Sequence, residues 1–157
     1  MSQPTADREL RVETVIAAVP ATVWAVLTDF SRMPEWSPEL VAMRPLLRGG
    51  LRTGQQYVGI NRRKAVVWPT RSVVSILDPG SVVAWDTRSS GARWIWELTP
   101  TGDGGTRVVH TRPVPTGLTR VSGVFAKAFL GGALGHADEL EAGMATTVER
   151  LKAAVEA

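Results

Sequence analysis

The architecture can be read most directly from residues 92–112, ARWIWELTPTGDGGTRVVHTR. Apolar and polar residues alternate in 92–99 and again in 105–112, which is the period of two that is typical of a half-buried strand. The segment 101–105 between them contains three glycines and an aspartate, residues that suit a tight turn. Because so short a connection joins antiparallel neighbours, this stretch predicts a β-hairpin.

The same alternation extends back along the chain to about residue 40. The segments between the strands hold turn residues, as in Arg48-Gly49-Gly50, Asp78-Pro79-Gly80 and Ser89-Ser90-Gly91. Strands do not alternate regularly with helices along the chain, as they do in proteins with a parallel sheet. We therefore expect a meander of antiparallel strands at residues 40–47, 54–62, 66–77, 81–87, 92–99 and 105–112.

The segments on either side of the meander predict one more strand and the helices. Residues 8–18 alternate and predict a first strand, after which Pro20 opens a helix. Asp29 can cap a second helix, which Pro34 limits to one or two turns. Residues 137–156 predict a long amphipathic helix, so we expect an α+β fold in which a curved sheet of about seven strands wraps around it. Its apolar stripe consists of Leu140, Met144, Thr147, Leu151 and Ala154.

Composition excludes several classes of protein. The 157 residues correspond to one domain over 1–157, with residues 1–7 expected to be flexible. A hydrophobic content of 44% and a net charge of +3 exclude a disordered chain. The absence of cysteine excludes a disulfide scaffold, a thiolate zinc site and a cysteine nucleophile. With no long apolar run and no signal-like start, we expect a cytoplasmic protein without a membrane span, and its few lysines among many arginines suggest a bacterial gene.

Two stretches near the N-terminus carry a resemblance to a known family. They are Val23-Trp24-Ala25-Val26-Leu27-Thr28-Asp29-Phe30 and Met33-Pro34-Glu35-Trp36-Ser37-Pro38. Together with Trp94-x-Trp96-x-Leu98 and Gly105-Thr106-Arg107-Val108, they resemble the START-like, or SRPBCC, superfamily of the birch-pollen allergen, in its polyketide cyclase/dehydrase branch.

This resemblance implies a helix-grip fold with a large apolar cavity between the sheet and the C-terminal helix. Members bind lipids, sterols, polyketides or similar molecules there, and some catalyse cyclisation or dehydration. We interpret the signature residues Trp24, Asp29, Pro34 and Trp36 as structural. In that interpretation Asp29 caps the second helix and Trp36 closes the base of the cavity beneath the long helix.

Strand parity places most of the large aromatic residues on matching faces. If those faces are concave, several indoles surround one space, and two interpretations stay open: an aromatic ligand pocket, or ordinary core packing. Under the first, the implied helix side of the cavity is closed by Phe125, Phe129 and Met144. The predicted ligand-binding residues are Tyr57, Asn61, Trp68, Thr70, Trp85, Trp94, Trp96, His110, Phe125, Phe129 and Met144.

His110 and His136 are the two histidines of the chain. Two interpretations stay open for each. Either histidine can act as a general acid or base on an enolisable ketone. Alternatively, His110 is a hydrogen-bonded core residue and His136 is a surface residue. Without carboxylates at ligand spacing we expect no metal site, and no motif indicates a cofactor. Because a buried charge is costly unless paired, we expect Arg112 at the rim of the cavity.

Two further segments leave alternatives open. Residues 119–134 are almost wholly apolar and can be a lid, a core helix or an interface. The stretch between Glu39 and Asp78 has no acidic residue, so it is either a patch for an anionic partner or a solvated hairpin face. No nucleic-acid motif is present, and we expect no nucleic-acid partner. The basic residues of this stretch are Arg44, Arg48, Arg52, Arg62, Arg63, Lys64 and Arg71.

The functional prediction is a protein, monomer or homodimer, that binds a hydrophobic small molecule, such as a lipid or polyketide, between the sheet and the C-terminal helix. The alternative is a cyclase/aromatase-type enzyme in which His110 transfers protons. A further alternative is a protein-interaction module that uses the basic hairpin face at Arg62, Arg63 and Lys64. We favour binding without catalysis because the chain lacks a convincing set of proton-transfer groups.

Overall fold

The structure is a computed structural model that describes residues 9–88, 91–113 and 133–157, with side chains from 138 onward in the last segment. The predictions made for residues 1–7, for Phe125 and Phe129, and for the rest of 119–132 therefore lie outside the described residues. The side chain of His136 lies outside them as well.

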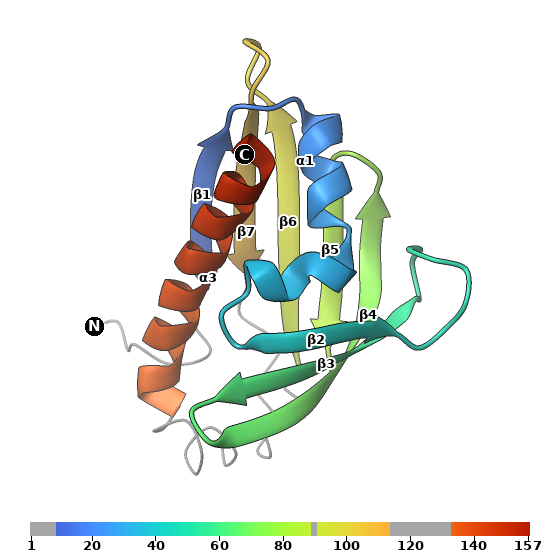
Figure 1. The fold of residues 1–157 in the computed structure, drawn as a ribbon, viewed down its shortest axis with the longest axis vertical. Coiled ribbons are helices and arrows are strands. Elements are labelled where there is room, and N and C mark those ends of the chain that lie inside the picture. Colours follow the sequence, from blue (N-terminus) through green and yellow to red (C-terminus); the bar gives the residue numbers. More distant parts are fainter. Residues whose placement is uncertain (1–8, 89–90, 114–132) are drawn as a thin grey trace.

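Every predicted strand is present, with ends within two residues of those expected (Figure 1). The C-terminal helix begins at Ala133, four residues earlier than the amphipathic pattern indicated. In chain order the elements are β1 (Leu10–Ile16), α1 (Pro20–Leu27), the 3-10 helix η1 (Phe30–Glu35), β2 (Leu40–Pro45), β3 (Gln56–Arg63), β4 (Val66–Asp78), β5 (Val82–Thr87), β6 (Ala92–Pro100), β7 (Thr106–Arg112) and α3 (Ala133–Glu156).

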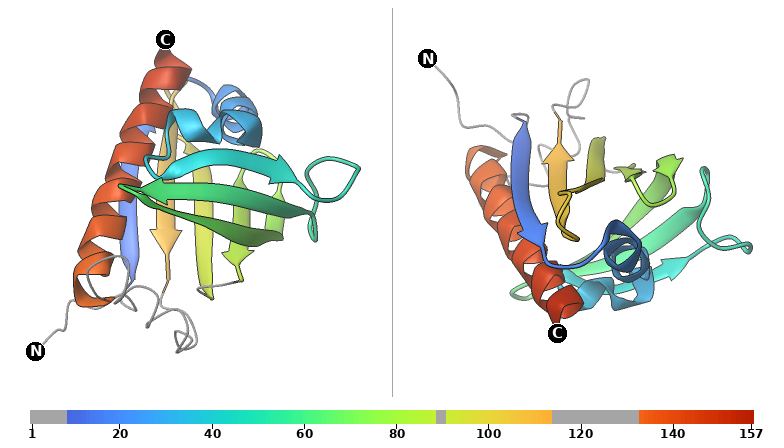
Figure 2. Two further views of the ribbon diagram at one scale, coloured as in Figure 1. Left: turned by 60° about the horizontal axis from the view of Figure 1, so that its bottom comes forward. Right: turned by 90° about the horizontal axis from the view of Figure 1, so that it is seen from above.

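The strands form one antiparallel sheet in the order β1-β7-β6-β5-β4-β3-β2, so β1 and β2 are its two edges. The sheet is strongly curved, and α1, η1 and α3 lie against its concave side, as both views in Figure 2 show. This arrangement confirms the α+β, helix-grip prediction. The curvature brings the edge strand β2 and its neighbour β3 round toward the helices, so the concave face is enclosed from several sides.

An irregularity in β4 contributes to the curvature. Val74 pairs with Trp85 and Leu77 pairs with Val83, although Val74 and Leu77 are an odd number of positions apart. The register shift at Ser75 adds one residue to β4 there, which is how a β-bulge bends a strand and increases its twist. Both Val74 and Leu77 consequently lie on the concave face, which simple alternation along β4 does not predict.

The core lies between the concave face and the helices. Fully buried side chains come from β1, α1, the residue that follows η1, and α3, among them Ile16, Leu27, Trp36, Val148 and Leu151. Trp36 belongs to the same buried cluster as the α3 residues Val148 and Leu151. Val148 was missed by the predicted apolar stripe because it lies one position beyond Thr147 on the same buried side of the helix.

The prediction for Asp29 is wrong in its detail. Asp29 does occupy the position before η1, but its side chain accepts no backbone hydrogen bond there. Instead, Asp29 Oδ1 accepts a 2.6 Å hydrogen bond from the hydroxyl of Ser31. η1 is a 3-10 helix of six residues that contains Pro34. It leaves fewer unpaired backbone amides at its start than the first turn of a full α-helix does, so there is less for a capping side chain to bind.

Helix α3 also reaches the free edge of β1. Lys152 Nζ donates a 2.7 Å hydrogen bond to the carbonyl of Val15, and the amide of Ala17 donates a 2.8 Å hydrogen bond to Glu156 Oε2. Lys152 and Glu156 are themselves an ion pair at 2.7 Å. The last turns of α3 are therefore held to β1 by polar contacts in addition to apolar packing.

The loop that connects β2 to β3, residues 46–55, is built around one buried side chain. Gln55 is 0% exposed, and its amide nitrogen donates to the carbonyls of Leu47 (2.9 Å) and Gly50 (2.8 Å). Its Oε1 accepts from the amides of Leu47 (3.2 Å) and Gln56 (2.9 Å). Gly49, Gly50 and Gly54 adopt positive φ angles that suit glycine, so sequence and side-chain contacts specify one loop conformation.

We predict that Gln55→Ala lowers the free energy of unfolding by about 2–3 kcal/mol, because it removes four hydrogen bonds from a buried group. Gln56→Ala is the matched control, since its side chain accepts only from the exposed guanidinium of Arg71, and it should change stability by less than about 1 kcal/mol. Urea denaturation with an unchanged slope measures both. Equal losses for the two variants would contradict the role given to Gln55.

Candidate functional site

The register of the sheet brings the predicted aromatic and polar residues onto one face. Asn61 lies opposite Trp68, Trp85 lies opposite Trp94, and Trp96 lies opposite His110. Because paired residues point to the same side of a sheet, the predicted faces are one continuous concave surface. The sequence-based parity is therefore correct for β3, β5, β6, β7 and the first part of β4.

His110 lies at the centre of an aromatic stack. Its ring is parallel to that of Trp96, with centroids 3.8 Å apart and planes 17° apart, and it also stacks on Trp94 at 5.9 Å and 24°. His110 Nδ1 lies 3.0 Å from the carbonyl oxygen of Ile95. A carbonyl can only accept, so Nδ1 carries the proton and Nε2 holds the free lone pair.

Burial dominates the acid–base behaviour of His110. The residue is 4% exposed, and desolvation of the charged form lowers its pKa to about 4, against the smaller raising effect of the hydrogen bond to Ile95. At neutral pH the imidazole is therefore uncharged. It can accept a hydrogen bond at Nε2, but it holds almost no proton to donate from that atom.

The prediction that Arg112 lies at the rim is wrong. Arg112 is 2% exposed, on the concave face beside His110 along β7. Its guanidinium lies over the ring of Trp94, 5.6 Å from the ring centroid. A desolvated cation is attracted to the face of an indole, which offsets part of the burial cost that led us to expect a rim position.

Asn61 and Thr70 form a polar pair near the other end of the concave face. Asn61 Nδ2 donates a 3.0 Å hydrogen bond to Thr70 Oγ1, and among the described residues the Thr70 hydroxyl hydrogen and Asn61 Oδ1 stay available. Gly59 lies opposite Thr70 and two residues before Asn61, and a Cβ at that position would come within 2.8 Å of Thr70 Oγ1 and 3.1 Å of Leu40 Cδ1. The glycine therefore makes room for this pair.

The remaining predicted residues fall into two groups. Trp85 and Trp96 are almost completely buried in the main apolar cluster, where Trp85 meets the ring of Phe30 edge-on at 5.4 Å, so they are core residues. Trp68 and Trp94 are half-buried, and Met144 of α3 is buried. The indole N–H of Trp96 has no hydrogen-bond partner in the part of the chain that the structure describes.

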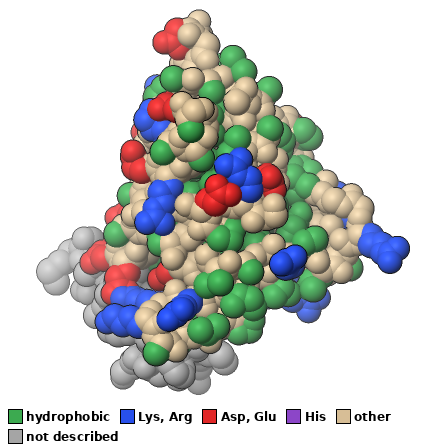
Figure 3. Space-filling view, in the orientation of Figure 1, with side chains coloured by type: hydrophobic (Ala, Val, Ile, Leu, Met, Phe, Trp, Pro, Cys, Tyr) green, Lys and Arg blue, Asp and Glu red, His purple; other side chains and the backbone are tan. Residues whose placement is uncertain are grey.

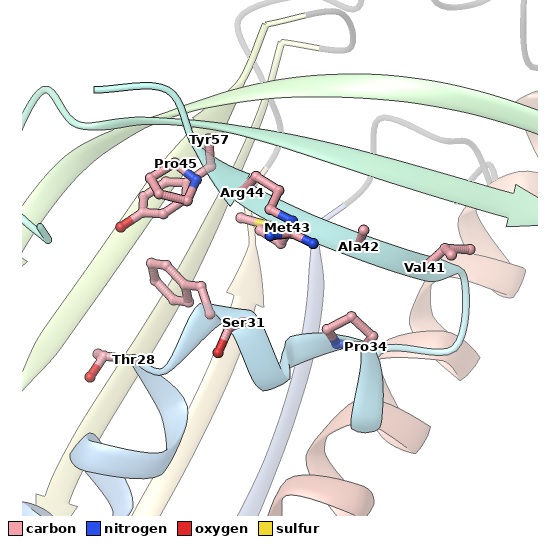
Figure 4. Close-up of a pocket in the computed structure, with 10 residues that line it drawn as sticks. Thr28, Ser31, Pro34, Val41, Ala42, Met43, Arg44, Pro45 and Tyr57 are labelled. Carbon is pink, nitrogen blue, oxygen red and sulfur yellow. The ribbon is translucent and has the colours of Figure 1, made fainter. Parts of the chain in front are cut away.

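Tyr57 lines a groove that the sequence did not predict. The groove has a volume of about 460 Å³, and in Figure 4 side chains from the η1 region, such as Ser31, face side chains of β2, such as Val41 and Arg44, across it. Tyr57 meets the ring of Phe30 edge-on at 5.0 Å, and burial raises its pKa. Nothing in the sequence pattern signals that η1 lies beside β2, because this contact is purely tertiary.

The basic hairpin between β3 and β4 is not a uniform cationic face. Arg63 forms an ion pair with Glu139 of α3, and Arg62 Nε donates a 3.0 Å hydrogen bond to the carbonyl of Lys64. Glu39 also lies near this pair, and burial raises its pKa against the lowering effect of Arg63. The hairpin is therefore attached to α3 through Arg63, which leaves less of it for an anionic partner.

Comparison with known proteins adds the family to this geometry. Residues 7–156 match the family described as polyketide cyclase / dehydrase and lipid transport. The chain belongs to this family. The START-like resemblance inferred from the sequence is thereby confirmed, and it extends over almost the whole chain of this polyketide cyclase/dehydrase family member. No curated protein matches the chain.

Solved structures share the fold of this family member at low sequence identity. The Zhui aromatase/cyclase from Streptomyces sp. R1128 superposes with a TM-score of 0.70 and 18% identity, over 95% of this chain and 93% of that one. The polyketide-cyclase-like protein Cgl2372 from Corynebacterium glutamicum gives 0.63 and 21%, over 94% and 91%. The di-domain ARO/CYC protein BexL of the BE-7585A pathway gives 0.68 and 15%, over 95% of this chain and 46% of that one.

None of the helices within the described residues has the length and apolar content of a membrane span.

We predict that Gly59→Ala rotates or displaces Thr70, breaks its hydrogen bond with Asn61 and destabilises the protein by about 1–2 kcal/mol. Gly143→Ala on α3 is the matched control, because a Cβ there meets no atom within 4 Å and helix propensity should stabilise the protein by about 0.5–1 kcal/mol. Thermal unfolding of both variants checks the opposite signs. A neutral Gly59→Ala would mean that the concave face has more room at this point than the contacts imply.

We also predict that His110 makes folding pH-dependent. Its folded pKa of about 4 lies below the ordinary value of 6.5, so between these pH values the unfolded chain binds a proton that the folded chain does not. Stability from this group is complete above about pH 6.5 and is lost as pH falls toward 4, by about 2 kcal/mol between pH 7 and pH 5.

Urea denaturation of the wild type and of His110→Gln at both pH values isolates this contribution, since the carboxylates affect both proteins alike. The variant should lose less stability than the wild type on acidification. An equal pH dependence of the two proteins would show that His110 is protonated as easily in the folded state as in the unfolded state.

Proposed function

We propose that this protein binds a hydrophobic small molecule, a polyketide or a lipid, on the concave face between the sheet and α3. The supporting observation is the stack of Trp94, His110 and Trp96 with Arg112 over Trp94. Trp94 is the half-buried ring of this stack and offers apolar surface, while the buried imidazole of His110 and guanidinium of Arg112 place polar groups against it. An apolar wall with a few convergent polar groups is the usual composition of a small-molecule site.

The exposure of the inner-face residues supports the same proposal. Asn61, Trp68, Thr70 and Trp94 keep part of their surface uncovered, while Val83, Leu98 and Val108 on the same face are buried. A ligand that lies over the half-buried residues would remove apolar area from water, which stabilises a complex by about 25 cal/mol per Å² before the entropic cost of association. The free acceptor of Asn61 and the free hydroxyl hydrogen of Thr70 would then orient its oxygen atoms.

The state of His110 favours binding over proton transfer. With a pKa of about 4, roughly one molecule in a thousand carries the imidazolium at pH 7, so the group is a poor general acid. As a base it is present but weak, since its conjugate acid is strong. Its Nε2 lone pair instead suits a hydrogen bond from a ligand hydroxyl or enol.

A cyclase/aromatase-type reaction is the second candidate. It is favoured by the neutral Nε2 of His110, which is an acceptor next to a flat aromatic wall, and by the aromatase/cyclase named among the similar structures. In this reaction the walls would hold a poly-ketone chain in a folded conformation, and His110 would accept a proton from a carbon between two carbonyls. Almost all of His110 is in the neutral form that this step requires, but the low basicity of that form limits the step.

We predict that freshly purified protein carries an added mass in native mass spectrometry that is absent after denaturation. Trp94→Ala should weaken the binding of that compound by about tenfold or more, because it removes the largest half-buried ring of the stack and uncovers Arg112. Trp24→Phe in α1 is the matched control, and its affinity should stay within about twofold. Titrations followed by tryptophan fluorescence measure all three proteins.

His110→Gln separates the two candidates. For a binding protein, affinity changes by a few fold and no substrate is turned over by the wild type. For an enzyme, turnover of a poly-ketone substrate is lost in the variant while its affinity is kept. No added mass, together with no binding across a panel of lipids and polyketides, would contradict the proposed function.

A further inference from the structure

The loop at residues 46–55 holds two of its three leucines in solvent. Leu46 is 49% exposed and Leu47 is 43% exposed, whereas Leu51 of the same loop is half-buried and packs against the main core. The chain therefore turns one leucine of this loop inward and holds the other two in solvent. We call residues 46–55 the Leu46–Leu47 loop.

Hydrogen bonds fix the backbone of the loop that exposes Leu46 and Leu47. The four hydrogen bonds of the buried Gln55 side chain hold Leu47 and Gly50, and the amide of Leu46 donates a 2.8 Å hydrogen bond to the carbonyl of Gln56. The amide of Gly54 donates to the carbonyl of Val74 at 2.8 Å, which attaches the loop to β4. Both leucines are thus presented on a fixed backbone.

The charges around these leucines have one sign. Arg44, Arg48 and Arg52 are exposed, and none of them forms an ion pair within the described residues. Arg52 Nη1 donates a 2.6 Å hydrogen bond to the carbonyl of Arg48, which fixes that cation on the loop itself. In Figure 3 the flank of the molecule on the side of β2 and this loop shows apolar and basic side chains without acidic ones.

We propose that the Leu46–Leu47 loop docks on the surface of a membrane that contains anionic lipids. Leu46 and Leu47 would enter the interface, while Arg44, Arg48 and Arg52 would lie against the headgroups. Apolar residues at a tip surrounded by cations match the depth profile of such a surface, where hydrocarbon begins just below a layer of negative charge. A protein partner would have to supply a largely acidic surface with a small apolar recess, which these observations do not specify.

The adjoining groove gives this docking a geometric consequence. Arg44 and Pro45 line the groove between η1 and β2 and lead directly into Leu46. A docked loop would therefore hold the groove beside the headgroups. The inference concerns the outer surface of the protein and does not depend on a ligand bound to the concave face.

The test is cosedimentation of the full chain with vesicles of phosphatidylcholine alone or with about 30% phosphatidylglycerol at low ionic strength. We expect binding only to the anionic vesicles, with loss at high salt. The double variant L46S/L47S should reduce the partition coefficient by about tenfold or more. Val19→Ser, which is also 49% exposed but lies beside α1, is the matched control and should bind within about twofold of the wild type.

Charge is tested separately. Arg48→Gln should weaken binding to the anionic vesicles by about fivefold, whereas Arg150→Gln on α3 should leave it within about twofold. Absence of binding to anionic vesicles at low salt, including the case in which the loop binds a protein instead, overturns the proposal. Binding that survives in L46S/L47S also overturns it, because it would be electrostatic adsorption without insertion. Native mass spectrometry of the same samples reports the bound small molecule, so failure here and failure of the proposed function are distinguishable.

Discussion

Covering one face of a curved antiparallel sheet is the constraint on which the other features of this protein depend. The concave face presents Leu98, Val108 and Trp96 from neighbouring strands, and the helices bury much of it. Curvature, increased by the bulge at Ser75, makes the inner surface narrower and deeper than that of a flat sheet. Large rings then fill it efficiently, which explains why tryptophans appear on three of its strands.

The same enclosure determines the chemistry of the polar residues on that face. His110 is kept neutral because a charged imidazole would lose its hydration there, and its tautomer is fixed by the Ile95 carbonyl. Arg112 cannot lose its charge, so it lies against the face of Trp94 instead. Both groups are in the same low-dielectric surroundings: His110 stays there as a neutral hydrogen-bond acceptor, and Arg112 stays there as a cation against an indole ring.

The fold was largely predictable from the sequence, because alternation, turn glycines and prolines, and the amphipathic helix are local signals. Site prediction was uneven for a physical reason. Parity correctly placed Trp94, Trp96 and His110 on one face, but it could not show that Arg112 has an indole to lie against, nor that η1 lies beside β2 to form a groove. The bulge at Ser75 and the role of Gln55 also depend on contacts with residues elsewhere in the chain.

The hydrogen bonds of Lys152 and Glu156 to the backbone of β1 have a consequence for solubility. β1 is an edge strand, and an edge strand offers unpaired amides and carbonyls to which another chain can add in register. By occupying the carbonyl of Val15 in β1 and the amide of Ala17 just after the strand, α3 blocks the end of that template with two charged side chains. The final turns of α3 thus hinder edge-to-edge aggregation through β1, which is the edge strand opposite β2.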